Sequence, residues 1–267
     1  MRILLAGSTG VIGRRLGPLL TDSGHEVVGL ARSGADRVVD VLDRDAVAAA
    51  VGEIHPDVVI HQLTSLSGRD LAANAWLRRE GTRNLVDAAL ASGVRRLIAQ
   101  SISWAYEPGR EPATEDTPLD VDAPEPRHTS VAGVAALEEA VRDVPEWVVL
   151  RYGTLYGPGT WYARDGALAG MVAADADVSS LLHVDDAAAA AVAALSWPSG
   201  AVNVCDDDPA PAAAWVPALR RAVGLPSPAI VEGDRRGWAR GASNQRARKE
   251  LGWNPRYPSW REGFATL

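Results

Sequence analysis

The chain has 267 residues, of which 47% are hydrophobic and 23% charged, and this composition is ordinary for a soluble globular protein. A formal net charge of −7 disfavours nucleic acid as a partner, because binding to phosphates needs a basic face. The single cysteine, Cys205, excludes an intramolecular disulfide and fits the reducing cytoplasm, where we expect the protein to reside. No apolar run approaches the roughly 20 residues of a membrane-spanning helix, and "RILLA" is too short for a signal-peptide core.

Short apolar runs alternate with helical patterns through the first part of the chain, which predicts an α/β fold with a doubly wound parallel Rossmann sheet. Gly17 and Pro18 weaken the first helical pattern. Strands are expected at residues 2–7, 25–31, 37–41, 56–63, 94–101 and 146–153, and helices at 11–24, 43–51, 69–93 and 129–143.

After Gly153 the alternation loosens, and the C-terminal segment is rich in Pro and Trp. A loop at 156–166, a helix at 185–197 and a strand at 201–207 are still expected. The predicted domains are a dinucleotide-binding domain over 1–155, to which 181–205 returns, and a small substrate-binding lobe. That C-terminal lobe comprises 156–180 and 206–267.

The stretch "GSTGVIG" lies between the first predicted strand and the first predicted helix. Glycines at 7, 10 and 13 allow a tight turn and let a pyrophosphate approach the backbone N–H groups at the helix start. A plain strand-to-helix turn is the alternative explanation. Because strands and helices alternate after it, we interpret the loop as a dinucleotide-binding site formed by Gly7, Thr9, Gly10, Val11 and Ile12.

The spacing of these glycines resembles that of the short-chain dehydrogenase/reductase superfamily, and further segments resemble its extended branch, the sugar-nucleotide epimerases and dehydratases. These segments are "GTRNLVDAALASGVRRLIAQSIS", "LRYGTLYGPGT", "LLHVDDAAAAAVAAL" and "SNQRARKELGWNPRYPSWREGF", and they occur in the family's order. The resemblance implies that Asp40 and Val41 lie beside the adenine and that Leu63 and Thr64 lie near the ribose and pyrophosphate. It also implies that Tyr152 and Gly153 contact the cofactor.

The residues after the second predicted strand favour NADP(H) as the cofactor. NAD-binding members usually carry an acidic residue there for the ribose hydroxyls, whereas this chain has Ala31, Arg32 and Ser33. Arg32 could pair with a 2′-phosphate, and Arg14 could assist. The alternative for Arg32 is a solvated loop arginine.

The catalytic Tyr-x-x-x-Lys pair of the superfamily is missing from this sequence. Alignment of Glu138 with the family's usual glutamate puts Ser130 at the tyrosine position and Val134 at the lysine position. None of the five tyrosines is followed four residues later by lysine, and the only lysine is Lys249. General acid–base catalysis contributes roughly 10²–10⁴-fold, so its loss slows hydride transfer without forbidding it.

The missing pair favours one-way reduction of an activated carbonyl, because oxidation of an alcohol needs a base. In "AQSISWAYEPG" the family's catalytic Ser/Thr position is occupied by Ile102. The candidates for binding or protonating the carbonyl are therefore Ser101, Ser103 and Tyr106, and we expect at least one of the two serines to be structural. Tyr106 has packing as its alternative role.

Aromatic residues suggest a flat substrate. Trp104, Trp161 and Tyr162 would suit an aromatic ligand, with "GTWYARDG" as a lid, unless they belong to the core. We expect no metal site, because the adjacent acids in "CDDDPAP" point in different directions, and we expect His183 with Asp185 and Asp186 to be structural.

The sequence resembles a group of atypical short-chain reductases, one member of which is the angucyclinone ketoreductase of simocyclinone biosynthesis. This resemblance implies a tailoring step on an aromatic polyketide. The expected function is an NADPH-dependent ketoreductase in antibiotic biosynthesis, acting on a small-molecule carbonyl substrate as a monomer or homodimer. The alternatives are a non-catalytic NADP(H) sensor and a sugar-nucleotide epimerase or dehydratase with displaced catalytic groups.

Overall fold

The computed structural model describes residues 1–66 and 68–267. The chain divides into two compact units. Unit 1 comprises Met1–Ser101, Asp120–Leu150 and Ala191–Ala201, and unit 2 comprises Ile102–Leu119, Arg151–Ala190 and Val202–Leu267.

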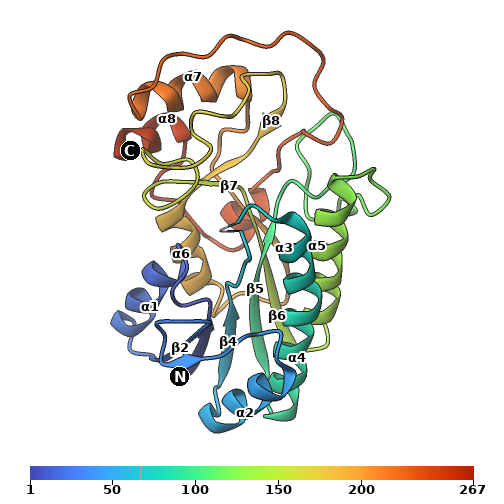
Figure 1. Cartoon of the computed structure of the whole chain (residues 1–267), viewed down its shortest axis with the longest axis vertical. Coiled ribbons are helices and arrows are strands. Elements are labelled where there is room, and N and C mark those ends of the chain that lie inside the picture. Colours follow the sequence, from blue (N-terminus) through green and yellow to red (C-terminus); the bar gives the residue numbers. More distant parts are fainter. Residues whose placement is uncertain (67) are drawn as a thin grey trace. The chain divides into compact units, whose positions relative to one another are not determined.

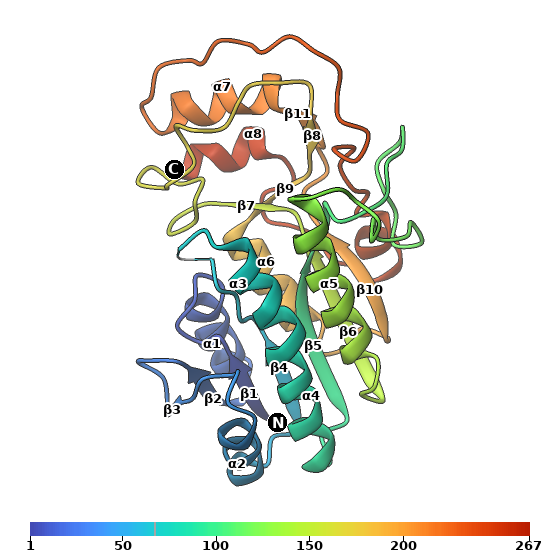
Figure 2. The same cartoon turned by 45° about the vertical axis from the view of Figure 1, so that its right-hand side comes forward.

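A seven-stranded sheet has the strand order β10-β6-β5-β4-β1-β2-β3 (Figures 1 and 2). Strand β1 pairs in parallel with both β2 and β4, and the pairs β2–β3 and β4–β5 are parallel too. The order reverses beside β1, as in doubly wound sheets, so the predicted α/β fold is confirmed. The strands are β1 (Arg2–Ala6), β2 (Glu26–Ala31), β3 (Arg37–Val38), β4 (Val58–His61), β5 (Arg96–Ile102), β6 (Glu146–Tyr152) and β10 (Gly200–Val204).

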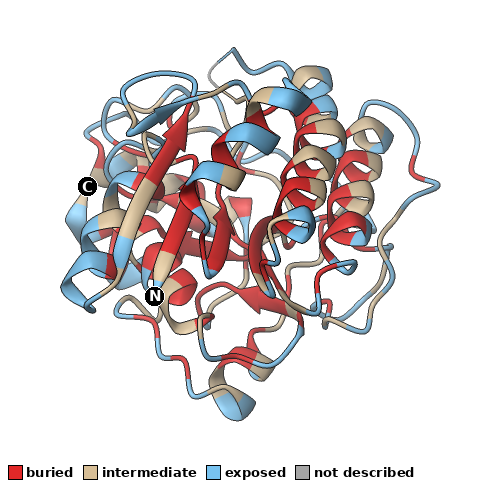
Figure 3. Cartoon of the chain, turned by 90° about the horizontal axis from the view of Figure 1, so that it is seen from below, coloured by how far each residue is buried: buried red, intermediate tan, exposed pale blue. Residues whose placement is uncertain are grey.

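The inner strands are buried on both faces, as the continuous apolar runs of the sequence predict (Figure 3). Leu4 and Ala6 of β1 belong to an apolar cluster with Val59 and Leu97 of the neighbouring strands. Alternation turns Leu5 to the opposite face, where its side chain approaches Gly17 of helix α1 (Gly13–Asp22). Helix α1 forms although Pro18 lies inside it.

Helices α2 (Arg44–Ile54), α4 (Thr82–Ala91) and α5 (Arg127–Val141) supply the other side of the apolar cluster around Leu4. Figure 2 shows α3 (Leu71–Trp76) in line with α4, and α5 beside them. A π-helical turn, Leu77–Gly81, joins α3 to α4. The long helix predicted from the sequence is therefore continuous and contains a single π-bulge.

Unit 2 has its own small sheets and core. Strands β7 (Thr154–Tyr156) and β9 (Leu181–His183) pair in parallel, and β8 (Val178–Ser179) and β11 (Ala210–Pro211) pair antiparallel. The core contains Tyr156, Leu181, Trp215, Leu219, Trp260 and Phe264. The remaining elements are α6 (Val184–Ala193), α7 (Ala212–Ala222), a π-helical turn (Arg246–Glu250), α8 (Trp260–Gly263) and a final 3-10 turn (Phe264–Thr266).

Across residues 1–66 and 68–267, no helix combines the length and the apolar character that crossing a membrane requires.

Candidate functional site

The glycine loop of unit 1 is shaped so that two of its glycines are required. Gly7 has a φ of +93°, and a Cβ added there would lie 2.8 Å from the backbone carbonyl of Gln62. A Cβ on Gly13 would lie 2.1 Å from the carbonyl oxygen of Gly7. Gly10 closes the turn by donating its N–H to Gly7 O at 3.0 Å. The loop therefore brings bare backbone to the first turn of α1, which fits a pyrophosphate.

A cavity of about 600 Å³ opens beside this loop, within unit 1. Thr9, Arg14 and Ser33 are among the residues that line it. Arg14 Nε donates to Thr9 O at 2.8 Å, which holds its guanidinium at the cavity. Arg32 is exposed, and among the residues that the structure describes nothing pairs with its side chain. The guanidinium of Arg14 and the hydroxyls of Thr9 and Ser33 thus line a cavity that suits the adenosine end of a dinucleotide.

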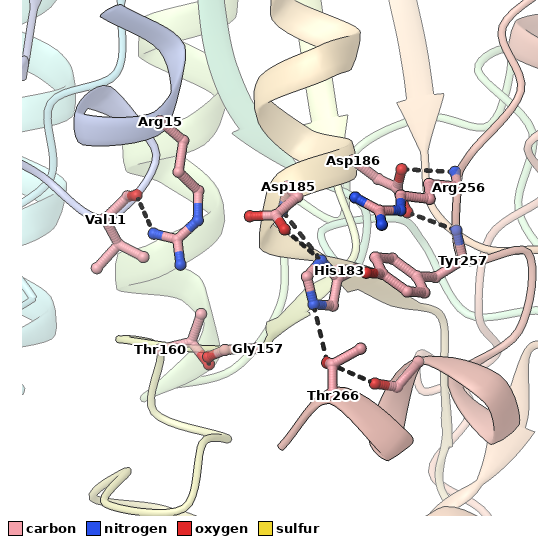
Figure 4. A network of polar contacts seen from close by, with 11 residues as sticks. Val11, Arg15, Gly157, Thr160, His183, Asp185, Asp186, Arg256, Tyr257 and Thr266 are labelled. Carbon is pink, nitrogen blue, oxygen red and sulfur yellow. Dashed lines mark hydrogen bonds and ion pairs between the residues drawn. The ribbon is translucent and has the colours of Figure 1, made fainter. Parts of the chain in front are cut away.

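The remaining cofactor residues predicted in unit 1 have well-defined places. Ile12 is buried under the loop, while Val11 is partly exposed and its carbonyl accepts from Arg15 Nη1 at 2.9 Å (Figure 4). Asp40 accepts from Leu42 N at 3.0 Å. Val41 is buried, and its side chain packs so close to Gly81 that a Cβ there would lie 2.7 Å away.

Leu63 and Thr64 follow strand β4, and a buried histidine fixes this segment. His61 Nδ1 accepts from Leu63 N at 3.2 Å, so the proton of the neutral ring is on Nε2, which lies 2.9 Å from Thr82 Oγ1. Burial, aided by the positive charge of Arg78, lowers the pKa of His61 to about 4. The residue is neutral at pH 7, and sequence reasoning did not identify it.

Ser101 ends the part of β5 that belongs to unit 1 and is buried. Its hydroxyl donates to Glu138 Oε1 on α5 at 2.7 Å. Burial lowers the pKa of Arg78 to about 10, and the negative charge of Glu138 partly offsets that effect. Ser101 thus belongs to a buried cluster with the charged residues Glu138 and Arg78. Its hydroxyl proton is used in the hydrogen bond to Glu138.

Helix α5 contains neither tyrosine nor lysine. Ser130 and Val134, which the alignment of Glu138 predicts to occupy the family's Tyr and Lys positions, are both buried. A close approach between α5 and α3 fixes the helix, because a Cβ on Gly133 would lie 2.8 Å from Ala75 Cα. The position is therefore filled by small and apolar groups.

Ser103 and Tyr106 belong to unit 2, where they are buried. Tyr106 Oη donates to Asn203 Oδ1 at 2.5 Å and accepts from Arg151 Nη1 at 2.8 Å. Ser103 donates its backbone N–H to Tyr152 O at 2.9 Å. In the described part of the chain no hydrogen bond occupies the Ser103 hydroxyl. Of the three predicted hydroxyls, two have their protons engaged within the protein.

The predicted cofactor contacts of unit 2 lie in a tightly packed turn. Tyr152 is buried, and its hydroxyl donates to Ala187 O at 3.2 Å. Gly153 donates its N–H to Val204 O at 2.9 Å, and a Cβ on it would lie 2.7 Å from Ser180 O. The turn thus requires glycine.

The three predicted substrate-binding aromatics differ in surroundings. Trp104 is 38% exposed and contacts Trp238, with ring centroids 6.4 Å apart. Trp161 is half-buried in the 156–166 loop, where its carbonyl accepts from Leu168 N at 3.0 Å. Tyr162 packs edge-on against Trp215 at 5.8 Å, and burial raises its pKa. Tyr162 is therefore packed against the core of unit 2. Trp238 was not identified from the sequence.

The side chains of His183 and Asp186 form hydrogen bonds with residues near the C-terminus. His183 Nδ1 accepts from Asp185 N at 3.1 Å, and its Nε2 lies 3.2 Å from Thr266 Oγ1 (Figure 4). Asp186 accepts from the backbone N–H groups of Arg256 and Tyr257 (Figure 4).

The run Asp206–Asp208 is engaged in the same way. Asp206 accepts from Trp260 N at 2.8 Å, and Asp207 and Asp208 pair with Arg248 and Arg261. The three carboxylates point in different directions, and in residues 1–66 and 68–267 no group of three metal-binding side chains converges.

Comparison with known proteins agrees with this geometry. The model of the NAD dependent epimerase/dehydratase family matches residues 3–205. A 3-diazoavenalumate denitrifying reductase from a Streptomyces species is 49% identical, over 99% of this chain and 99% of its own length. The dTDP-4-dehydrorhamnose reductase of Streptomyces griseus is 31% identical, over 69% of this chain and 59% of its own length.

Solved structures share the fold. UDP-glucose 4-epimerase from Thermotoga maritima, determined with UDP-glucose, has a TM-score of 0.79 at 20% identity, covering 100% of this chain and 97% of the other. A short-chain dehydrogenase/reductase superfamily protein from Agrobacterium tumefaciens with bound NAD has a TM-score of 0.76 at 26% identity, covering 100% and 96%. The chain therefore belongs to the NAD-dependent epimerase/dehydratase family, as an oxidoreductase that uses a nicotinamide dinucleotide.

Proposed function

We propose that the protein is an NADPH-dependent reductase that removes a diazo group from an aromatic substrate as dinitrogen. The observation that carries the proposal is the lack of an available acid–base pair. Ser130 and Val134 are the residues that we align with the family's Tyr and Lys, and the hydroxyl protons of Ser101 and Tyr106 are engaged by Glu138 and Asn203. A reaction that needs no proton from the protein suits such a site.

Reductive denitrification meets this condition. When bound, the cofactor supplies a hydride whose electron pair forms the new C–H bond of an arenediazonium ion, while dinitrogen leaves with the electron pair of the C–N bond. The balance is ArN₂⁺ + NADPH → ArH + N₂ + NADP⁺, in which no proton is taken up or released. The relative named as a denitrifying reductase, at 49% identity, supports the choice of a diazo substrate.

The protein's task in this scheme is to bind and orient the two reactants and to exclude water. Gly7, Gly10 and Gly13 offer backbone to the pyrophosphate, and Thr9 with Arg14 lines the neighbouring cavity. Arg32 is the group we assign to the 2′-phosphate, as its side chain has no partner among the described residues. Asp40, Val41, Leu63 and Thr64 complete the proposed cofactor contacts of unit 1, and Tyr152 and Gly153 those of unit 2.

The test is consumption of NADPH with a panel of arenediazonium salts and a matched panel of aryl ketones, with NADH run in parallel. We expect NADPH oxidation with the diazonium salts and release of one dinitrogen per NADPH. A sample without protein and the Gly13→Ala variant control for direct reduction of diazonium ions by the cofactor. Oxidation with ketones alone, or dinitrogen release that does not need NADPH, contradicts the proposal.

A second candidate is ketone reduction, with Ser103 as the group that hydrogen-bonds the carbonyl. The observation in its favour is the Ser103 hydroxyl, which no described residue occupies, and the 31% identity to dTDP-4-dehydrorhamnose reductase adds support. Ser103→Ala separates the two reactions, because we expect it to slow ketone reduction about 10²-fold or more. The same variant should leave denitrification within about threefold of the wild type, since no proton is needed.

A further inference from the structure

Two tryptophans from distant parts of the chain meet on unit 2. Trp104 follows strand β5, and Trp238 lies in the segment between α7 and the π-helical turn at 246–250. Their ring centroids are 6.4 Å apart, and the ring planes are inclined by 50°. Trp104 is 38% exposed and Trp238 is half-buried, so the pair forms an open corner.

Backbone hydrogen bonds hold this corner in place. Residues 104–113 and 235–243 run side by side, with Gly109 N donating to Gly237 O at 3.0 Å. Further along, Ala113 N donates to Gly241 O at 3.0 Å and Ser243 N donates to Ala113 O at 2.8 Å. The positions of the two rings are therefore set by the backbone before any ligand binds, which lowers the entropic cost of binding.

Arginines strengthen the same junction. Arg235 Nη2 donates to Gly109 O at 2.8 Å, and Arg240 Nη1 donates to Glu107 O at 3.3 Å. The guanidinium of Arg236 lies 4.8 Å from the ring centroid of Trp238 and is bound by Asp177. Arg236 therefore packs against the ring of Trp238 as one member of an ion pair with Asp177.

We propose that Trp104 and Trp238 form a binding corner for a planar, electron-poor aromatic ring, which stacks on the exposed part of Trp104 with its edge toward Trp238. This inference rests on the proposed function, since an arenediazonium ring is planar, cationic and electron-poor. The 50° inclination suits one stacked ring with one ring edge-on, which aromatic groups prefer to a face-to-face sandwich. The electron-rich face of an indole attracts cations more strongly than the other aromatic side chains do.

The experiment measures binding of N-methylquinolinium, a planar aromatic cation, by calorimetry without NADPH. We expect Trp104→Ala and Trp238→Ala to weaken binding by about tenfold, and quinoline, neutral at pH 8, to bind the wild type less tightly than the cation does. Trp76→Ala is the matched control, because Trp76 is 50% exposed on α3 of unit 1. That variant should bind as the wild type does.

The variants Trp104→Phe and Trp238→Phe are controls for misfolding of the alanine variants, because a phenyl ring keeps part of the stacking surface. They should weaken binding by about threefold. The proposed binding corner is wrong if N-methylquinolinium binds the wild type and both alanine variants with equal affinity. It is also wrong if Trp76→Ala weakens binding as much as Trp104→Ala and Trp238→Ala do.

The corner and the proposed function fail separately. If diazonium salts are not reduced but N-methylquinolinium binds at Trp104, the binding corner is supported and the proposed denitrification is wrong. If diazonium salts are reduced and their KM is unchanged in Trp104→Ala, the binding corner is wrong and the proposed denitrification is supported.

Discussion

Tyr106 Oη donates a 2.5 Å hydrogen bond to Asn203 Oδ1, across 97 residues of sequence. The same oxygen accepts from Arg151 Nη1 at 2.8 Å, and the Arg151 guanidinium lies 4.9 Å from the Tyr106 ring centroid. Asn203 in turn donates its backbone N–H to Glu115 Oε1 at 2.8 Å. The hydroxyl that the sequence suggests as a proton donor is therefore part of a buried network in unit 2.

This relationship predicts a structural effect for Tyr106→Phe. Loss of the hydroxyl leaves Asn203 Oδ1 without its donor and should lower the free energy of unfolding by about 1–3 kcal/mol. We expect kcat for denitrification to stay within about threefold of the wild type. Thermal unfolding and steady-state kinetics check the two parts.

The control is Tyr156→Phe. Tyr156 is fully buried in unit 2, and within the described residues its hydroxyl has no hydrogen-bond partner, so its removal should be neutral or stabilising. A stable Tyr106→Phe protein with kcat reduced by about 10²-fold or more would instead make Tyr106 an acid catalyst.

Cofactor choice is tested at Arg32. Arg32→Ser removes the group assigned to the 2′-phosphate, and loss of a charge-assisted hydrogen bond should raise the Kd for NADPH by about 10- to 100-fold. The Kd for NADH should change little. Arg37→Ser is the matched control, because Arg37 is exposed and makes only weak contacts among the described residues, a 4.0 Å ion pair with Glu53 and a 3.5 Å hydrogen bond to Asp36 O. Equal loss of both cofactors, or loss in Arg37→Ser, would contradict the assignment.

The glycine loop gives a steric prediction. In Gly13→Ala the added methyl carbon would stand 2.1 Å from Gly7 O, so the loop must distort and the Kd for the cofactor should rise by more than about tenfold. Gly52→Ala in α2 is the contrast, since nothing lies within 4 Å of its added Cβ. That variant should gain about 0.5–1 kcal/mol of stability and bind the cofactor normally.

The buried histidine predicts a pH dependence of stability. The pKa of His61 is lowered to about 4 in the folded protein, whereas an unfolded histidine has its ordinary value near 6.5. Between these pH values the unfolded chain binds the extra proton, so stability falls as the pH falls from about 6.5 to 4, by about 1.4 kcal/mol per pH unit. Above pH 6.5 this contribution is fully present.

Urea unfolding of the wild type and His61→Gln across this pH range isolates the effect. The wild type should show the additional slope, and the variant should lack it. His128→Gln, at an exposed histidine, is the control and should keep the slope. The same slope in the wild type and in His61→Gln would show that another group is responsible.

Much of the fold could be predicted from the sequence, because apolar runs such as "RILLA" specify buried parallel strands by composition alone. Helix α1 shows a limit, since Pro18 argued against a helix that packing of Leu16 and Leu20 nevertheless stabilises. The bulge at Leu77–Gly81 left no periodic signal, because a single π-helical turn barely shifts the apolar pattern.

The polar partners could not be predicted. The Tyr106–Asn203 and Trp104–Trp238 contacts join residues far apart in sequence, and each depends on tertiary packing. Ser101 and Ser103 looked equivalent in "SISW", yet only Ser101 finds a carboxylate, on Glu138. Trp238 lies in a segment without helical or strand periodicity, so nothing local marked it as a partner of Trp104.

The most direct test of the central claim is the origin of the new arene hydrogen. The protein is supplied with NADPH deuterated at the transferred position and an arenediazonium salt in ordinary water, and the reverse labelling is done in D₂O. We expect deuterium on the arene carbon from the cofactor and none from the solvent, and a reaction rate that does not depend on the ionisation of an acidic group of the protein. Deuterium from D₂O at that carbon, with none from the cofactor, would contradict the proposal.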